Sequence, residues 1–389
     1  MIAGQDVTIL GAGIGGLTAA VALAGRGAQV TVLEQAPEIT EVGAGLQISP
    51  NGVRVLDALG LGDAARSRAM QGRGVWLRDG ISGREVIDFS FEKVAPKATF
   101  LLFHRADLID LLAKAARDAG VVIRCGAQVE RVTPGLGAAT VKLAGAPSCE
   151  MGFVIGADGL HSVTHSAMNG ARAPFFTGQV AWRATVPATG REPAEATVFM
   201  GPGRHMVTYP LRDGTMVNIV AVEERGTWAD EGWNHQDDPD NMRKAFSGFC
   251  DDAQALLERA ETAHLWGLFR HPVALNWHYG HCAILGDAAH PTLPFMAQGA
   301  VMAIEDAWVL AACLDRDGPQ NGPQRYQLLR RARCEKIVAA AGKNARNYHY
   351  ANPLARHLGH GALRLAGRLA PQQVFNRFSW IYDADVTKA

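Results

Sequence analysis

The chain has 389 residues, 48% of them hydrophobic, with 38 basic and 38 acidic side chains and a formal net charge of zero. A chain of this length can bury a large core and favours two lobes, and its balanced charge favours neither a nucleic acid nor an anionic membrane as partner. No apolar run reaches the roughly 20 residues of a transmembrane helix, and the first predicted strand begins too early to follow a signal peptide. A cytoplasmic protein is therefore expected.

The first predicted elements are a buried strand at 6–10, a glycine-rich turn and an alanine-rich helix from 14 to about 26. The glycines of this GAGIGG turn are Gly11, Gly13 and Gly16. They allow a tight turn and the close approach of a pyrophosphate to the helix N-terminus. A second strand at 30–33 leads to Glu34, which is placed to accept hydrogen bonds from a ribose hydroxyl. This order of elements predicts a dinucleotide-binding lobe, but the motif alone does not distinguish NAD from FAD.

The middle of the chain alternates between two kinds of pattern. Residues 72–92 predict a β-hairpin, 106–116 a helix, and 149–160 a strand that runs into a GADG turn. Residues 178–187 and 196–222 alternate apolar and polar side chains between turns, which is typical of an antiparallel sheet. The pattern predicts that the two lobes interleave.

The predicted fold class is α/β, with a Rossmann-like nucleotide-binding lobe, an inserted antiparallel β-sheet substrate lobe and a C-terminal helical segment. The nucleotide-binding lobe is expected in the ranges 1–71, 100–176 and 272–389, the last of which includes the C-terminal helices. The substrate lobe is expected to combine a hairpin at 72–99 with a sheet at 177–271.

A last strand at 283–285 ends at Asp287, within the segment GDAAHP. A carboxylate at the carboxyl end of a parallel strand can hold a polyol. Prolines then precede a helix with Gln298 and Gly299 near its start, so the positive end of this helix can face a ring carbonyl such as that of a flavin pyrimidine. Taken alone, GDAAHP is equally consistent with a simple strand-to-loop turn.

Three motifs in order, GAGIGG, GADG and GDAAHP, with HRADL between the first two, resemble those of the single-component flavin-dependent aromatic hydroxylases. The resemblance implies that Asp158 and Gly159 lie in the motif shared by FAD and the pyridine nucleotide, that Asp287 contacts the ribityl chain, and that Arg105 helps to hold FAD. The family usually continues the second motif as DGxxSxxR, whereas His165 stands here at the arginine position. This departure concerns docking of the pyridine nucleotide rather than of the flavin. The other expected contacts of a non-covalently bound FAD are Gln47, Pro294, Gln298 and Gly299.

Within that class the chain is similar to the salicylate, 3-hydroxybenzoate and 6-hydroxynicotinate hydroxylases, through GAGLQISPNGVRVLDALGLGDAA, RHMVTYPLRDG and LPFMAQGAVMAIEDA. In these relatives a histidine and a tyrosine four residues apart line the substrate pocket, which implies that role for His205 and Tyr209, with Gln298 nearby. Residues i and i+4 of a strand lie on one face, so both side chains can reach one ligand. Without the resemblance such a pair is more often packing. Gln47 matches the 3-hydroxybenzoate type, whereas the hydroxynicotinate type has histidine there.

The resemblance implies hydroxylation of a small phenolic carboxylate by NADH, or NADPH, and O2, through a C4a-hydroperoxide of the reduced FAD. His205 would act as the base and Tyr209 would position the substrate. A phenol has a reference pKa of about 10 and histidine one of about 6.5, so the phenolate must also be stabilised locally. The alternatives are a hydroxylase of a larger phenol, such as a quinone precursor or polycyclic metabolite, a nicotinamide-dependent dehydrogenase, or a non-catalytic flavin-binding protein. No metal site is expected, and the protein is expected to be a monomer or homodimer.

Overall fold

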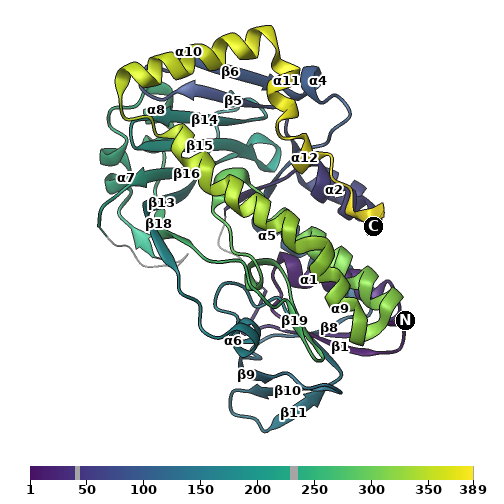
Figure 1. The fold of residues 1–389 in the computed structure, drawn as a ribbon. Coiled ribbons are helices and arrows are strands. Elements are labelled where there is room, and N and C mark those ends of the chain that lie inside the picture. The colour runs from purple at the N-terminus through teal and green to yellow at the C-terminus, as the bar shows by residue number, and fades with distance from the viewer. Residues whose placement is uncertain (40–43, 228–234, 389) are drawn as a thin grey trace.

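The structure is a computed structural model that describes residues 1–39, 44–227 and 235–388. Figure 1 shows two lobes, one built on a parallel sheet and one on a large antiparallel sheet. The long helix α9 (Gly299–Tyr348) runs diagonally from the first lobe to the second and is interrupted at Gly318, whose φ is +74°. The predicted α/β class with an inserted antiparallel sheet is confirmed.

The six-stranded sheet of the parallel-sheet lobe has the order β19-β20-β12-β1-β2-β8, and all neighbouring pairs are parallel except β19 with β20. Its strands are β1 (Asp6–Leu10), β2 (Gln29–Leu33), β8 (Val122–Arg124), β12 (Phe153–Gly156), β19 (His278–Tyr279) and β20 (Cys282–Ile284). They come from three distant parts of the chain, which confirms that the two lobes interleave.

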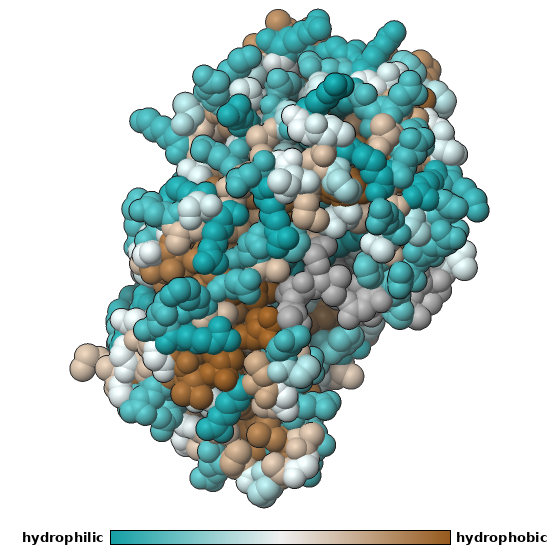
Figure 2. All heavy atoms as spheres, turned by 180° about the vertical axis from the view of Figure 1, so that it is seen from behind, coloured by the Kyte–Doolittle hydropathy of each residue, from teal (hydrophilic) through white to brown (hydrophobic). Residues whose placement is uncertain are grey.

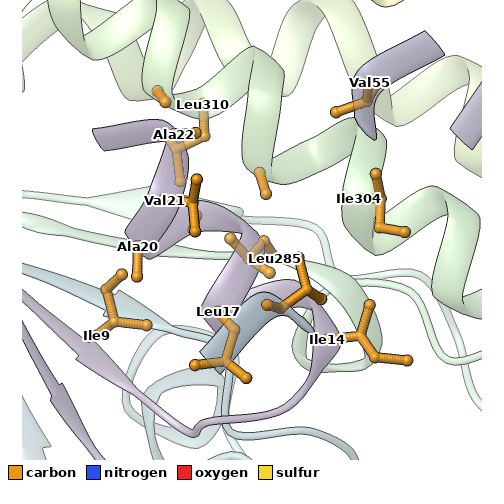
Figure 3. Close-up of a cluster of buried hydrophobic side chains, with 14 of the residues drawn as sticks. Ile9, Ile14, Leu17, Ala20, Val21, Ala22, Val55, Leu285, Ile304 and Leu310 are labelled. Atoms are coloured by element: carbon orange, nitrogen blue, oxygen red, sulfur yellow. The ribbon is translucent and has the colours of Figure 1, made fainter. Parts of the chain in front are cut away.

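Helix α1 (Ile14–Ala24) is buried against this sheet and against α9. Figure 3 shows Leu17 and Val21 of α1 within a cluster that also includes Ile304 and Leu310 of α9. The helix ends two residues before the predicted limit because Gly27, with φ +84°, turns the chain back toward β2. This packing fixes the helix N-terminus above the glycine turn.

The antiparallel-sheet lobe contains eight strands in the order β17-β18-β13-β16-β15-β14-β5-β6. The strands are β5 (Gly74–Asp79), β6 (Glu85–Ser90), β13 (Phe175–Pro187), β14 (Glu195–Gly201), β15 (Arg204–Leu211), β16 (Met216–Glu224), β17 (Gln236–Asp237) and β18 (Ala263–Arg270). The predicted hairpin is confirmed as β5 and β6, and it joins the sheet through the parallel pair β5 and β14. One face packs on α7 and α8 around Trp182 and Phe246. The other face meets the loop that carries Leu293 and Phe295.

Two small sheets and the remaining helices complete the fold. The single strand predicted at 149–160 is two strands, β11 and β12, and β11 belongs to a separate three-stranded sheet, β11-β10-β9. The other strands are β3 (Gly45–Ile48), β4 (Met70–Gln71), β7 (Leu101–His104), β9 (Val129–Thr133), β10 (Ala139–Leu143) and β11 (Ser148–Met151). The other helices are α2 (Pro50–Ala58), α3 (Gly62–Arg68), α4 (Phe91–Val94), α5 (Arg105–Asp118), α6 (Val163–Asn169), α7 (Pro239–Ala245), α8 (Asp251–Glu258), α10 (Pro353–Leu369), α11 (Pro371–Asn376) and α12 (Ser379–Tyr382), with 3-10 turns η1 (Arg212–Gly214), η2 (Gly286–Ala288), η3 (Pro294–Met296) and η4 (Val386–Lys388).

The C-terminal helices return to the antiparallel-sheet lobe, where α10 packs against β6. Seen from the opposite side in Figure 2, the surface of this lobe is mostly hydrophilic, whereas apolar side chains gather below the middle of the molecule. Among the described residues, no helix is both long and apolar enough to cross a membrane.

Candidate active site

The predicted dinucleotide residues meet at one edge of the parallel sheet. Strands β1, β2, β12 and β20 run in the same direction, so their carboxyl ends lie together. These ends lead into Gly11, Glu34, Asp158 and Asp287. The fold therefore brings together motifs that are up to 276 residues apart in the chain.

The three glycines of the first turn are explained by different features of the local structure. Gly11 has φ +100°, and a Cβ added to it would lie 2.5 Å from the carbonyl oxygen of Ala157. A Cβ on Gly16 would lie 2.0 Å from the carbonyl oxygen of Gly11. A Cβ on Gly13 would meet no atom within 4 Å. The first and third glycines are thus required by close packing, whereas the second leaves open space at the N-terminus of α1, where a pyrophosphate fits.

Glu34 lies beside this turn. One of its carboxylate oxygens accepts a hydrogen bond from the Ala12 N–H at 2.7 Å, and the other accepts one from the Ala36 N–H at 2.9 Å. These bonds hold the acid next to the glycine turn, at the place expected for a residue that contacts the adenosine ribose.

Asp287 and Asp158 differ sharply in their surroundings. Asp287 is the one exposed residue within the buried segment 282–290, and it follows Gly286, whose φ is +60°. Asp158 instead accepts hydrogen bonds from the Ser162 hydroxyl at 2.6 Å and the Thr164 N–H at 3.2 Å, at the start of α6. Burial raises the pKa of Asp158, although these bonds oppose the rise. The Asp287 side chain is therefore available to a ligand. The Asp158 carboxylate is already engaged in holding the turn between Gly159 and the start of α6.

The position where the family pattern has arginine is occupied by a pair of side chains. His165 is buried, and its Nδ1 lies 2.9 Å from the carbonyl oxygen of Ala288. The Arg172 guanidinium donates to the same carbonyl and lies 3.2 Å from His165 Nδ1. An arginine thus reaches this corner from the segment that follows α6, seven residues after His165, which no spacing in the motif indicated.

Gln47 and Arg105 approach the site from the sheet β3-β7-β4. Gln47 is half-buried on β3, and Arg105 is the half-buried first residue of α5, directly after β7. Because β3 pairs with β7, with Gly45 opposite His104, the start of β3 and Arg105 lie close together. The Arg105 N–H donates to the carbonyl oxygen of Ala44 at 2.9 Å.

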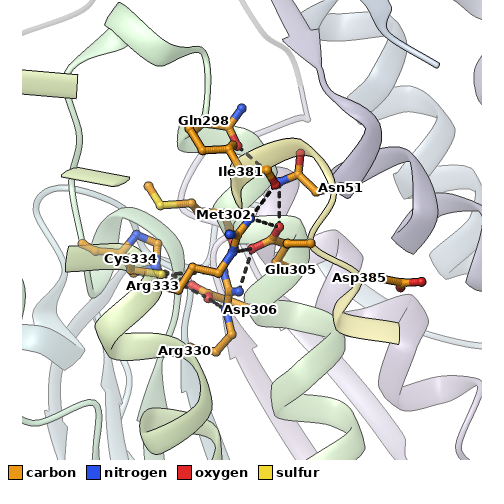
Figure 4. Close-up of polar contacts among 12 residues, drawn as sticks. Asn51, Gln298, Met302, Glu305, Asp306, Arg330, Arg333, Cys334, Ile381 and Asp385 are labelled. Carbon is orange, nitrogen blue, oxygen red and sulfur yellow. Dashed lines mark hydrogen bonds and ion pairs between the residues drawn. The ribbon is translucent and has the colours of Figure 1, made fainter. Parts of the chain in front are cut away.

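Gln298 is engaged inside the protein. It is 1% exposed, its Nε2 donates to the Ser49 hydroxyl at 2.9 Å, and its Oε1 accepts from Asn51 Nδ2 at 3.3 Å. Asn51 also donates to Glu305 at 2.6 Å (Figure 4). The preceding Ala297 has φ +50°, an uncommon conformation for alanine that turns the loop from η3 into α9. The loop with Pro294, Gln298 and Gly299 is thus held from behind, and a side-chain contact of Gln298 with a ligand stays a prediction.

His205 and Tyr209 lie on β15 and are both buried. The alternation of the strand puts them on one face. On that face the His205 ring lies 5.4 Å from the ring of Phe295, and Tyr209 packs in a cluster with Leu102. Burial raises the pKa of Tyr209, with opposition from Arg183, so its hydroxyl stays protonated. Burial, followed by the neighbouring His349, lowers the pKa of His205 well below its usual value. The face therefore offers a neutral imidazole and a neutral phenol.

Tyr209 has an unusually close neighbour in Gly45. A Cβ on Gly45 would lie 2.5 Å from Tyr209 Cε2 and 2.8 Å from Asn218 Cβ, while the Gly45 N–H donates to Asn218 Oδ1 at 2.7 Å. Asn218 pairs with Tyr209 across β15 and β16. The absence of a side chain at residue 45 thus lets the two lobes meet directly at the candidate site.

We expect Gly45→Ala to destabilise the protein by about 1–3 kcal/mol, because the added methyl group overpacks this contact. Urea unfolding of the variant checks this, with Gly248→Ala as control, because Gly248 also lacks a positive φ and a Cβ there meets no atom within 4 Å. A loss for Gly45→Ala no greater than for Gly248→Ala would show that the contact yields without cost.

Residues that the sequence did not single out complete the environment of His205. His349, in the segment after α9, places its Nε2 2.6 Å from His205 Nδ1, and its own Nδ1 lies 2.8 Å from Glu224 Oε1. Tyr348 places its ring 5.1 Å from that of His205. His205 and His349 are 144 residues apart in the chain, so no local pattern could have joined them.

One buried group of potential metal ligands occurs in the described residues, namely His290, Asp306 and Cys334. Asp306 is hydrogen-bonded to His290 and forms an ion pair with Arg330 Nε at 2.7 Å. Figure 4 shows the Arg330 side chain running between Cys334, Asp306 and Glu305. A guanidinium thus supplies the positive charge in this group, and we assign it a structural role.

The residues at the edge of the parallel sheet fit FAD. Gly13 leaves open space where a pyrophosphate fits, Glu34 lies at the place expected for a ribose contact, and Asp287 is an exposed carboxylate at the opposite end of the edge.

We expect Asp287→Ala to lower FAD occupancy because it removes a charged acceptor from the predicted polyol site. The ratio of flavin to protein absorbance after extensive dialysis checks this, with Glu335→Ala, at an exposed position of α9, as control. Full occupancy in Asp287→Ala would contradict its assignment to the ribityl chain.

Comparison with known proteins agrees with this geometry. The sequence matches the FAD binding domain family over residues 5–341. It is 33% identical over 388 residues to 3-amino-4-hydroxybenzoate 2-monooxygenase PtmB3 of Streptomyces platensis, covering 97% of this chain and 95% of that protein. It is also 33% identical over 393 residues to 3-hydroxybenzoate 6-hydroxylase of Polaromonas naphthalenivorans, covering 98% and 96%.

The structure of Klebsiella pneumoniae HpxO, solved with FAD and uric acid, is similar with a TM-score of 0.82 and 26% identity, over 94% of both chains. The resemblance drawn from the motifs is thus confirmed, and the dehydrogenase alternative is not supported. Because the family match spans most of the chain and these relatives are matched over nearly their whole length, the chain belongs to the FAD binding domain family and is a flavin-dependent aromatic-ring monooxygenase.

Proposed function

We propose that this monooxygenase hydroxylates a small phenolic aromatic carboxylate, of the hydroxybenzoate or salicylate type, with NADH and O2. The observation that carries the proposal is the pair His205 and Tyr209, both buried on one face of the antiparallel sheet, where the His205 ring lies against Phe295 and Tyr209 lies against Gly45. Relatives named for hydroxybenzoate substrates, one at 33% identity over nearly the whole chain, support the substrate class.

The polar groups around Tyr209 suit a substrate with both a hydroxyl and a carboxylate. Asn218 is fully buried, and its Nδ2 has no hydrogen-bond partner among the described residues. The positive charge of Arg183 acts on Tyr209 from β13, which is separated from β15 by β16. A carboxylate bound here would accept hydrogen bonds from Tyr209 and Asn218 and would be attracted by Arg183.

The other groups prepare the ring for attack. The residues at the edge of the parallel sheet would hold FAD non-covalently. The bound FAD would accept electrons from NADH and activate O2. His205, neutral because burial lowers its pKa, accepts the proton of the substrate hydroxyl, which makes the ring more electron-rich. The rings of Phe295 and Tyr348 pack around His205 and exclude water, which limits unproductive loss of the activated oxygen.

A panel of hydroxybenzoates and hydroxypyridine carboxylates tests the proposal. NADH oxidation, O2 consumption and product identity are measured for each compound, and NADPH is compared with NADH. We expect at least one monohydroxylated benzoate to give one product molecule per NADH. If only larger phenols give coupled product, the substrate class is wrong, and a strong preference for NADPH would overturn the choice of reductant alone.

A further inference from the structure

We propose that His349 and Glu224 are positioning residues that orient the His205 imidazole and carry the proton it accepts from the substrate hydroxyl to solvent. The three side chains form an unbroken series of hydrogen bonds, from the buried His205 through His349 to Glu224. This proposal rests on the proposed role of His205 as the base.

The carboxylate at one end fixes the direction of every hydrogen bond. Glu224 can only accept, so His349 Nδ1 carries a hydrogen and donates it across 2.8 Å. A neutral His349 then has a lone pair on Nε2, and His205 Nδ1 must donate to it across 2.6 Å. The remaining nitrogen of His205, Nε2, is consequently an acceptor. The arrangement therefore holds His205 in the one neutral tautomer that can take a proton through Nε2.

The same series provides an exit for the proton. His205 is 1% exposed and His349 is 5% exposed, whereas the side chain of Glu224 is 51% exposed. Burial lowers the pKa of His205, so a positive charge is not retained there. When Nε2 takes the substrate proton, the Nδ1 proton can pass to His349 Nε2, the His349 Nδ1 proton to Glu224, and then to water. The reverse transfer, when the product oxygen regains its proton, restores the starting tautomers.

The charged and titratable groups around the two rings come from three elements. Tyr348 on α9 stays neutral because burial raises its pKa to about 12. Burial is the largest influence on His349 and lowers its pKa; Glu224 on β16 opposes this, and Arg204 on β15 adds to it. Arg204 is itself paired with Glu223 at 3.4 Å. His349 is thus neutral near pH 7, as the series requires.

Two substitutions interrupt the series at different depths. Glu224→Gln removes the charge at a half-exposed position with little change in shape, and His349→Phe replaces the second ring with an apolar one. Glu223→Gln is the matched control, because Glu223 is adjacent in sequence but pairs with Arg204 and Arg225. We expect kcat to fall about 10- to 100-fold in both test variants, less than for removal of the base itself, with KM and FAD reduction nearly unchanged.

The decisive readouts report on the proton. Binding of substrate to the oxidised holoenzyme should release a proton, which a stopped-flow experiment detects with an indicator dye. The absorbance of the bound phenolate is followed in the same experiment. In both test variants we expect the proton release and the appearance of the phenolate to be slower than in the control, and we expect activity to recover as pH rises, because hydroxide can then replace the relay. A merely structural role would not produce this recovery.

The outcomes separate this proposal from the proposed function. If His205→Ala lowers coupled hydroxylation while Glu224→Gln and His349→Phe match Glu223→Gln in kcat, proton release and pH profile, the relay is wrong and the base stands. If His205→Ala itself keeps the normal rate, the proposed base is wrong. If His349→Phe fails to fold, Glu224→Gln still tests the relay, because Glu224 lies at the surface.

Discussion

Replacing His205 with alanine is expected to lower the rate of product formation about 100- to 10,000-fold, the usual cost of losing a general base. The substrate hydroxyl would then keep its proton, since the neighbouring Tyr209 is itself a neutral phenol. The ring would stay too electron-poor to capture the activated oxygen before it decays. FAD binding should persist, because the residues that fit FAD lie in the other lobe.

Three quantities measured on the same preparation distinguish this result from misfolding. Flavin content and the rate of FAD reduction by NADH should stay close to normal, product formation should fall, and hydrogen peroxide release should rise. Thr208→Ala is the matched control, because Thr208 is also buried on β15 but points to the opposite face. A His205→Ala enzyme that hydroxylates at the normal rate with tight coupling would make His205 a packing residue.

The strands and turns at the edge of the parallel sheet could be predicted well from the sequence, because local motifs mark them. The strand expected at 6–10 is β1, and the hairpin expected at 72–92 is β5 and β6, since period and turn residues are local signals. Parallel strands place their carboxyl ends together, so Gly11, Glu34 and Asp287 follow from the topology once the strands are known. The individual site roles and the domain limits remain predictions.

Contacts between distant segments were beyond the reach of such signals. His349 meets His205 only because α9 crosses from one lobe to the other and ends beside β15. Arg172 reaches the Ala288 carbonyl from outside the motif that carries His165. The direction of the Gln298 side chain depends on Ser49 and Asn51, which lie 249 and 247 residues earlier in the chain. These are properties of packing, and one sequence does not encode them in its spacing.

The largest loss of stability is expected from Asp306→Ala. Asp306 is fully buried in α9 and forms an ion pair with Arg330 (Figure 4). It also accepts a hydrogen bond from the Gly286 N–H at 3.1 Å and is hydrogen-bonded to His290. Its removal leaves Arg330, which is 1% exposed, with fewer partners for a buried charge, and releases both ends of the segment 286–290. We expect the free energy of unfolding to fall by about 3–5 kcal/mol. FAD occupancy should fall with it, because Asp287 lies in that segment.

The pH dependence of this loss has a definite sign. His290 and Arg330 hold the pKa of Asp306 below its usual value despite burial, so its contribution is present above about pH 4, the usual pKa of aspartate, and is lost as pH falls toward the lowered value. Burial lowers the pKa of His290, but Cys334 and Asp306 outweigh it and raise this pKa well above its usual value. The contribution of His290 is therefore present below about pH 6.5 and is lost only as pH rises through that higher value. The deficit of Asp306→Ala should therefore be large from about pH 5 to neutral and shrink in stronger acid. Urea unfolding at several pH values measures it, with Glu335→Ala, an exposed partner of Arg331 on the same helix, as control. Equal losses in the two variants would show that the buried pair contributes no more than a surface one.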